Sequence, residues 1–174
     1  PGRIVPEAAP TGFDMHQSHI NSPRMDHHPH FFGYGSLVNR TTHGFGHARP
    51  AAVSGWRRVW RRAHRRPAAF LSVEPAPDAE IEGLIAAVPD GDWTALDARE
   101  AAYDRHGVTA QVRHAGPGRP EVAIYRLQPG RHEPPSADFP ILLSYVDVVI
   151  QGFLNEYGPA GAERFVETTA GWDA

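Results

Sequence analysis

Short apolar runs, most of them too short for helices, follow one another through much of the chain and predict a strand-rich domain. The first run, residues 31–34, leads into a glycine-rich turn and indicates a short buried strand. Gly83 predicts a bulge or a close approach of another segment within its strand. Further strands are predicted at 51–62, 68–73, 80–88, 108–112 and 121–127.

Three segments predict helices instead. Residues 92–105 form the first, with Asp92 as the N-cap. In residues 140–157, apolar residues recur at steps of three and four, which is typical of a helix with one face on a core. Gly158 and Pro159 predict its end, and a last helix is expected over 160–169. Because strands outnumber helices and several are consecutive, we expect an α+β fold with a strongly curved or closed sheet.

The N-terminal segment differs from the rest. Residues 1–29 are dominated by Pro, His, Ser and Asn, with isolated apolar residues. Such a segment buries too little surface to offset the entropy of ordering it. We therefore expect a flexible tail over 1–29 and one folded domain over 30–174.

Composition narrows the chemistry. The chain has no cysteine, which excludes disulfides, thiolate catalysis and cysteine metal sites. All 17 basic residues are arginine, so a Schiff-base lysine is excluded. The net charge of −3 predicts no nucleic-acid partner. No apolar run approaches the ~20 residues of a membrane span, and no signal peptide is recognisable, so we expect a cytoplasmic protein.

One basic run, residues 56–62, alternates arginine with tryptophan. Such a pattern can bind single-stranded nucleic acid by charge and stacking. On a strand, arginine stems can instead cover apolar surface and keep their charged heads in water. We favour the second interpretation because of the acidic net charge. Three histidines, His27, His28 and His30, suggest incidental metal binding rather than a built site.

A carboxylate lies among apolar residues in the first predicted helix. Trp93, Leu96, Glu100 and Tyr103 are spaced at i, i+3, i+7 and i+10, which places them on one helical face. Burial raises the pKa of a carboxyl group, and an acid/base catalyst uses this effect near neutral pH. The alternatives are a salt bridge to an arginine at the edge of the core, or a place at the margin of the stripe.

The turn Gly33-Tyr34-Gly35-Ser36-Leu37 follows the first strand. Its alternate glycines permit positive φ and a close approach to a ligand, and successive N–H groups can bind an anion. Ser36 adds a hydroxyl group. These features suit a substrate carboxylate or an oxyanion, although glycines at a strand end can serve turn geometry alone.

Four blocks, in order over residues 31–158, resemble the γ-glutamylcyclotransferase superfamily. They are Phe31-Phe32-Gly33-Tyr34-Gly35-Ser36-Leu37, then Leu96-Asp97-Ala98-Arg99-Glu100 with Tyr103, then Ala123-Ile124-Tyr125, and Tyr145 to Gly152. The resemblance implies a small mixed β-barrel flanked by helices. It implies Glu100 as the catalytic residue, with no metal and no cofactor. It also implies a substrate pocket made by Tyr34, Gly35, Ser36, Leu37, Tyr103 and Tyr125.

The reaction implied by the resemblance is an intramolecular aminolysis of a small γ-glutamyl substrate. It yields 5-oxoproline and releases an amine, an amino acid or a dipeptide. Val38-Asn39-Arg40 replaces the Ile/Met-Trp pair usual in the glutathione-degrading branch, so the leaving group stays open. Two alternatives remain: a catalytically inactive γ-glutamyl-binding domain, and acyl-transfer trimming of a γ-glutamyl intermediate.

Overall fold

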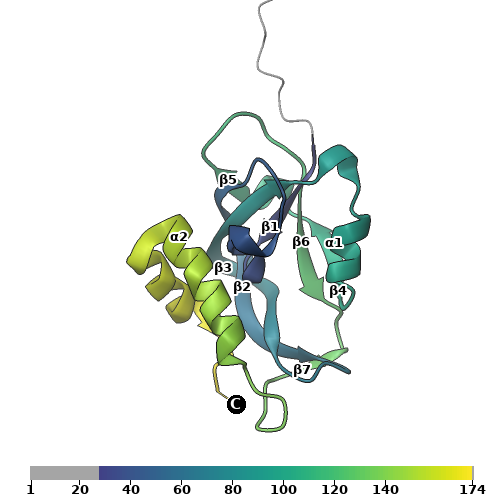
Figure 1. The fold of residues 1–174 in the computed structure, drawn as a ribbon, viewed down its shortest axis with the longest axis vertical. Helices are drawn as coiled ribbons and strands as arrows, with labels where there is room; N and C mark the ends of the chain where they lie inside the picture. Colours follow the sequence, from purple (N-terminus) through teal and green to yellow (C-terminus); the bar gives the residue numbers. More distant parts are fainter. Residues whose placement is uncertain (1–27, 174) are drawn as a thin grey trace, which may run out of the picture.

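A computed structural model describes residues 28–173 (Figure 1). Its strands are β1 (His30–Gly33), β2 (Arg49–Ala63), β3 (Phe70–Ala87), β4 (Tyr103–Gly107), β5 (Val112–His114), β6 (Val122–Leu127), β7 (His132–Glu133) and β8 (Thr169–Ala170). The helices are α1 (Thr94–Arg99) and α2 (Leu143–Thr168), with 3-10 turns η1 (Ser36–Val38), η2 (Arg40–Thr42), η3 (Pro89–Gly91) and η4 (Thr109–Gln111). All but the last two residues of the predicted tail, 1–29, lie outside the described residues.

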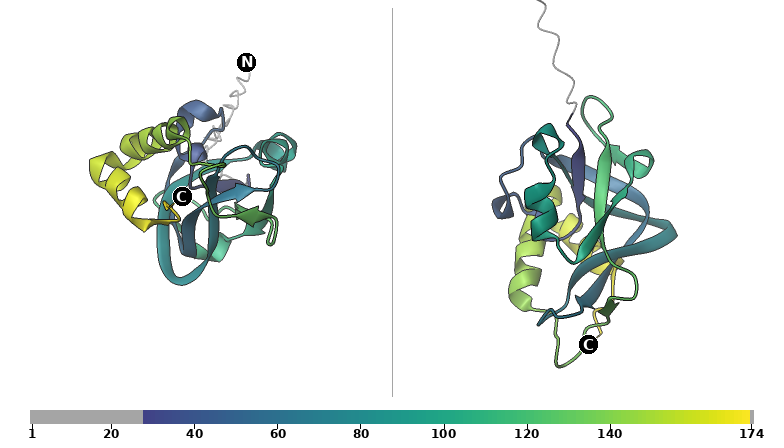
Figure 2. Two further views of the ribbon diagram at one scale, coloured as in Figure 1. Left: turned by 90° about the horizontal axis from the view of Figure 1, so that it is seen from below. Right: turned by 90° about the vertical axis from the view of Figure 1, so that its right-hand side faces the viewer.

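The sheet is mixed and strongly curled. Its strand order is β4-β6-β1-β3-β2-β5, and both β7 and β8 pair with β2. The β1–β6 and β2–β8 pairs are parallel, and the others are antiparallel. Figure 2 shows the sheet curling into a half-barrel, with α2 along one side. The predicted α+β class with a strongly curved sheet is therefore confirmed, and the sheet is open rather than closed because β4 and β5 end its strand order.

The two longest strands bend sharply at one bulge. Ser54 pairs with Glu80 and Trp56 pairs with Pro75, so residues 76–79 stand opposite Gly55 alone. Gly55 has a φ of 82°, which glycine adopts without strain. The prediction of separate strands at 68–73 and 80–88 was wrong, since the chain stays extended through the proline-containing bulge. The bend directs the two ends of one hairpin to different parts of the fold.

Gly83 lies in β3, where β1 approaches it closely, so one of the two predicted roles of this glycine is confirmed. A Cβ atom at this position would lie 2.2 Å from the carbonyl oxygen of Gly33. The glycine therefore serves a close approach, whereas the bulge falls at Gly55.

The first helix is much shorter than predicted. It ends at Arg99 rather than 105, and residues from Tyr103 onward form β4 beside β6. Ladder hydrogen bonds to β6 outweigh the helical preference of this segment. Trp93 is the N-cap, although the Asp92 carboxylate accepts a bond from the Thr94 N–H at 3.0 Å. The predicted strand at 108–112 is also wrong, because η4 and then β5 occupy this region.

The long helix α2 packs against the turn that follows β1. It breaks at Gly158, whose φ is 70°, as predicted, and its second part ends near the expected position. Its buried residues include Val146, Val149 and Phe153, while two leucines within the predicted helix 140–157, Leu142 and Leu154, are exposed. Within residues 28–173, no helix has the length and apolar character that a membrane span requires.

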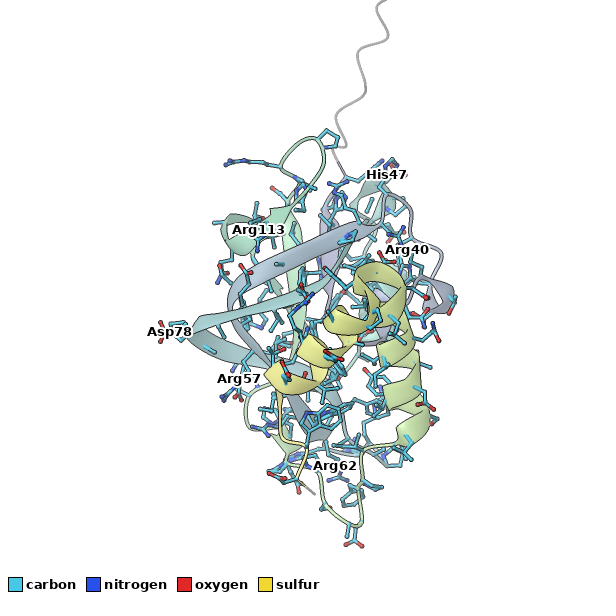
Figure 3. The ribbon with its side chains drawn as sticks, turned by 90° about the vertical axis from the view of Figure 1, so that its left-hand side faces the viewer. Arg40, His47, Arg57, Arg62, Asp78 and Arg113 are labelled. Atoms are coloured by element: carbon cyan, nitrogen blue, oxygen red, sulfur yellow. The ribbon has the colours of Figure 1, made fainter. Side chains whose placement is uncertain are left out.

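Two polar contacts join α2 to the η1–η2 turn. The Asn39 side-chain amide donates to the Val148 carbonyl at 2.9 Å. Arg40 donates to both carboxylate oxygens of Glu156, and Figure 3 shows Arg40 beside the helix. The turn that carries Ser36 is thereby held at a fixed position on α2.

The arginine–tryptophan run does not form a continuous basic surface. Arg58 is only 1% exposed, and its guanidinium lies 5.0 and 5.2 Å from the ring centroids of Phe153 and Phe165. The expectation that these arginine heads lie in water is therefore wrong for Arg58. Arg57 and Arg62 lie at separate places on the surface (Figure 3), where they pair with acidic residues.

Candidate active site

Glu100 follows α1 directly, where its N–H donates to the Leu96 carbonyl at 2.9 Å and closes the helix. Its side chain is 17% exposed, and the Arg99 Nε lies 3.3 Å from its Oε1. Burial raises the pKa of Glu100, while the charges of Arg99 and Arg66 oppose that rise. The salt bridge considered as an alternative is thus present, and the carboxyl group is also buried as an acid/base catalyst would require.

Two adjoining cavities meet at this carboxyl group. The larger has a volume of about 190 Å³ and the smaller about 40 Å³. They share Ser36, Glu100, Tyr103 and Tyr145 as lining residues. Glu100 therefore faces the turn after β1 across a hollow, although the helical-face argument that led to it was partly wrong, because Tyr103 belongs to β4.

The turn after β1 lines the smaller cavity over Gly33 to Leu37. Its glycines do not have positive φ, contrary to our expectation: Gly35 has a φ of −126° and a ψ of −127°. They serve a close approach instead, since a Cβ on Gly35 would lie 3.0 Å from the Tyr145 hydroxyl oxygen. The N–H groups of Ser36 and Leu37 stand in the first turn of η1, where no intrahelical acceptor is available to them.

The predicted pocket tyrosines all line the smaller cavity, and their hydroxyl groups are engaged. Tyr34 donates to the Tyr125 carbonyl at 2.6 Å, and Tyr103 donates to the Leu71 carbonyl at 2.9 Å. Tyr125 donates to the Asp97 carboxylate at 2.5 Å. Burial is the largest cause that raises the pKa of Tyr34 and Tyr103. The tyrosines therefore act as neutral walls that define the shape of the cavity.

Several residues of the site were not predicted from the sequence. Tyr145, in the first turn of α2, approaches Gly35, and burial raises its pKa to about 12. Arg99 reaches the Ser36 hydroxyl at 3.3 Å, and so connects the acid with the turn. Its position next to Glu100 was an available signal. Arg61, Arg66 and Phe70 line the larger cavity from the β2–β3 hairpin, and no local pattern indicated that this hairpin reaches Glu100.

Metal ligation receives no support from this geometry. In the part of the chain that the structure describes, no group of three His, Asp or Glu side chains gathers at ligand distance. The residues present instead combine one acid, one hydroxyl group, backbone N–H donors and guanidinium groups. Such a set can transfer protons and hold anionic substrate groups.

Comparison with known proteins gives the family and the fold. The family described as "Gamma-glutamyl cyclotransferase, AIG2-like" matches residues 31–141. No curated protein matches the chain significantly in sequence. Solved structures of similar fold include one named "Gamma-glutamyl cyclotransferase", with 16% identity and a TM-score of 0.61 over 80% of this chain and 87% of that one.

Two further structures share the fold. The human uncharacterized protein loc79017 is 16% identical, with a TM-score of 0.61 over 82% of this chain and 88% of that one. YkqA from Bacillus subtilis is 15% identical, with a TM-score of 0.62 over 80% of this chain. This chain spans only 53% of the YkqA chain. At these identities the likeness concerns the fold.

Proposed function

Since the chain belongs to the gamma-glutamyl cyclotransferase, AIG2-like family, we propose that it cyclises a small γ-glutamyl compound to 5-oxoproline without a cofactor. The leaving group departs as an amine, an amino acid or a dipeptide. The observation that carries this proposal is the placement of Glu100. Its partly buried carboxyl group faces a cavity whose opposite wall includes Ser36 of the turn after β1.

The reaction needs the substrate to fold back on itself. The α-nitrogen of the γ-glutamyl group attacks its own γ-carbonyl carbon, and a new C–N bond closes a five-membered ring. The bond between that carbon and the leaving nitrogen then breaks. A cavity that holds the two reacting atoms together supplies much of the rate by removing the entropic cost of their approach. The walls made by Tyr34, Tyr103 and Tyr125 would hold the substrate in this folded form.

Proton transfer is assigned to Glu100. The attacking nitrogen loses one proton when its ammonium becomes an amine, and a second when the ring amide forms. Glu100 would accept a proton from this nitrogen and deliver it to the leaving nitrogen, which then departs as a neutral amine. The amine takes up the other proton in water. A raised carboxyl pKa suits this cycle, because the group then accepts and returns a proton at smaller free-energy cost.

The turn after β1 is assigned to anion binding. The N–H groups near Gly35, Ser36 and Leu37 would donate to the oxyanion of the tetrahedral intermediate or to the substrate carboxylate. The guanidinium of Arg99 supplies a positive charge next to the Ser36 hydroxyl.

The direct test is a Glu100→Gln variant assayed for 5-oxoproline on a panel of γ-glutamyl amino acids, peptides and amines. We expect normal folding and a loss of turnover of at least about 10²-fold, as for removal of a general acid/base. Glu80→Gln is the matched control, because Glu80 is a surface carboxylate paired with Arg113. Turnover by Glu100→Gln at the parental rate would refute the assignment. Binding of γ-glutamyl compounds by the parental protein without any product would favour the inactive binding domain.

A further inference from the structure

The hollow next to Glu100 has a strongly cationic wall. Arg61, Arg66 and Arg99 all line the larger cavity, and Glu100 is the one carboxylate among its lining residues. A γ-glutamyl group brings a single carboxylate of its own. One guanidinium group suffices for that carboxylate, and Arg99 lies next to the Ser36 turn to which the carboxylate is assigned.

The three guanidinium groups differ in how far they are already engaged. Arg99 contacts Glu100, the Ser36 hydroxyl and the Thr42 carbonyl. Arg61 donates to the Trp60 carbonyl at 3.2 Å and to Glu74 at 3.4 Å. Within residues 28–173, no group hydrogen-bonds to the Arg66 guanidinium, whose charge acts on Glu100 only from a distance. Arg66 is thus the arginine of this cavity whose guanidinium N–H groups are available to a ligand.

Beyond Arg66 the hollow continues into a wider groove of about 650 Å³. The groove and the larger cavity share Ala63, Arg66 and Ala102 as lining residues. His64, Arg65 and Arg131 also line the groove, and none of its lining residues carries a carboxylate. The nearby Glu133 lies 3.5 Å from His64, so its negative charge offsets the positive charge on one side of the groove only.

The direction of the substrate follows from the chemistry. The γ-glutamyl half must lie at Glu100 and the turn after β1, so the leaving group extends toward Arg66 and the groove. Granted the proposed cyclotransferase activity, we propose that the leaving group bears a free carboxylate and that Arg66 binds it. The substrate class is then a γ-glutamyl amino acid or peptide with a free carboxylate rather than a simple γ-glutamyl amine.

A pair of substrates that differ only in this charge tests the inference. We would compare γ-glutamyl-alanyl-glycine with its C-terminal amide, by kcat/KM for 5-oxoproline release. The parental protein should prefer the carboxylate by about tenfold, or about 1.4 kcal/mol. Arg66→Gln should reduce that ratio to about one, and Arg66→Lys should restore part of it because the charge returns. Arg119→Gln, in the β5–β6 loop, should keep the parental ratio.

The outcomes separate this inference from the proposed function. Equal turnover of both substrates by the parental protein would overturn the inference and leave the cyclotransferase activity standing. An equal loss on both substrates in Arg66→Gln would also overturn it, since Arg66 would then bind the carboxylate of the γ-glutamyl half. Absence of 5-oxoproline from every γ-glutamyl substrate would overturn the proposed function, and the inference with it.

Discussion

A single carboxyl group, Glu100, experiences two opposing effects. Burial disfavours its charged form and raises its pKa, and this effect is the largest. The neighbouring Arg99 favours the charged form and limits the rise. A residue held between these effects can change protonation during turnover, whereas a solvated glutamate would stay ionised at neutral pH.

The balance predicts the pH dependence of the reaction. If ionised Glu100 is the base, kcat/KM falls as the pH falls through its raised pKa, so the acid limb lies above the usual glutamate range. Arg99→Gln removes a charge that lowers this pKa, and should therefore move the acid limb to higher pH. The measurement is a pH profile of kcat/KM for both proteins. Arg113→Gln, which breaks a surface pair with Glu80, should leave the limb in place, and an unmoved limb in Arg99→Gln would contradict the assignment.

Among the secondary-structure elements, the contact between α2 and the turn after β1 positions the site most directly. A Cβ at Gly152 would lie 2.7 Å from the Asn39 nitrogen and 2.9 Å from its Cα. Asn39 follows η1, whose residue Ser36 lines both cavities. The absence of a side chain at Gly152 therefore sets how closely the helix approaches the turn.

Gly152→Ala should lower both stability and activity. Helix propensity alone would favour alanine by up to about 1 kcal/mol, but overpacking against a backbone costs about 1–3 kcal/mol. We expect the clash to outweigh the gain in helix propensity and to displace η1. The unfolding free energy in urea and kcat/KM should then both be lower. Gly107→Ala is the matched control, because a Cβ there meets nothing within 4 Å. A Gly152→Ala protein as stable and active as the parent would refute this account.

The elements that the sequence predicted well are those defined by local pattern. The strand at 31–34, the strand at 121–127 and the helix break at Gly158 all depend on nearby residues, and all are present. The helix expected over 92–105 failed because β6 recruits Tyr103 and its successors into a ladder. The periodicity of a segment does not reveal that it pairs with a strand some twenty residues away.

The same distinction applies to the candidate site. Glu100 and the glycine turn stand out because their chemistry is unusual for their local surroundings. Arg61 and Arg66 look like ordinary members of a basic run, and their place at the cavity follows from the bend of β2 and β3 at Gly55. Their role could not be deduced before the path of that hairpin was known.

The β2–β3 hairpin connects the two halves of the fold. One end pairs with β1 and β5, where the sheet continues toward β6 and β4, while the other carries the arginines of the cavity. On the side facing α2, the Arg58 side chain links several elements by hydrogen bonds. It donates to the Glu82 carbonyl at 2.7 Å and to the hydroxyl groups of Thr168 and Thr169. One side chain thus joins β2, β3, the end of α2 and β8.

Arg58 is predicted to stabilise the protein through this joining of elements rather than through catalysis. Burial lowers its pKa to about 9, which reflects a large cost of desolvating the charge. Arg58→Ala leaves a cavity between Phe153 and Phe165 and unpairs the Glu82 carbonyl, so the unfolding free energy should fall by about 3 kcal/mol. Arg58→Met fills most of that space without a buried charge and should recover at least half of the loss.

Urea unfolding at neutral pH measures both variants against Arg57→Gln. Arg57 is the neighbouring arginine on the opposite face of β2, half exposed and paired with Glu74, so its replacement should change stability by less than about 0.5 kcal/mol. Because Arg58 lines neither cavity, the folded fraction of each variant should keep the parental kcat/KM. An Arg58→Ala protein as stable as Arg57→Gln would show that this buried guanidinium does not hold the bent hairpin against α2.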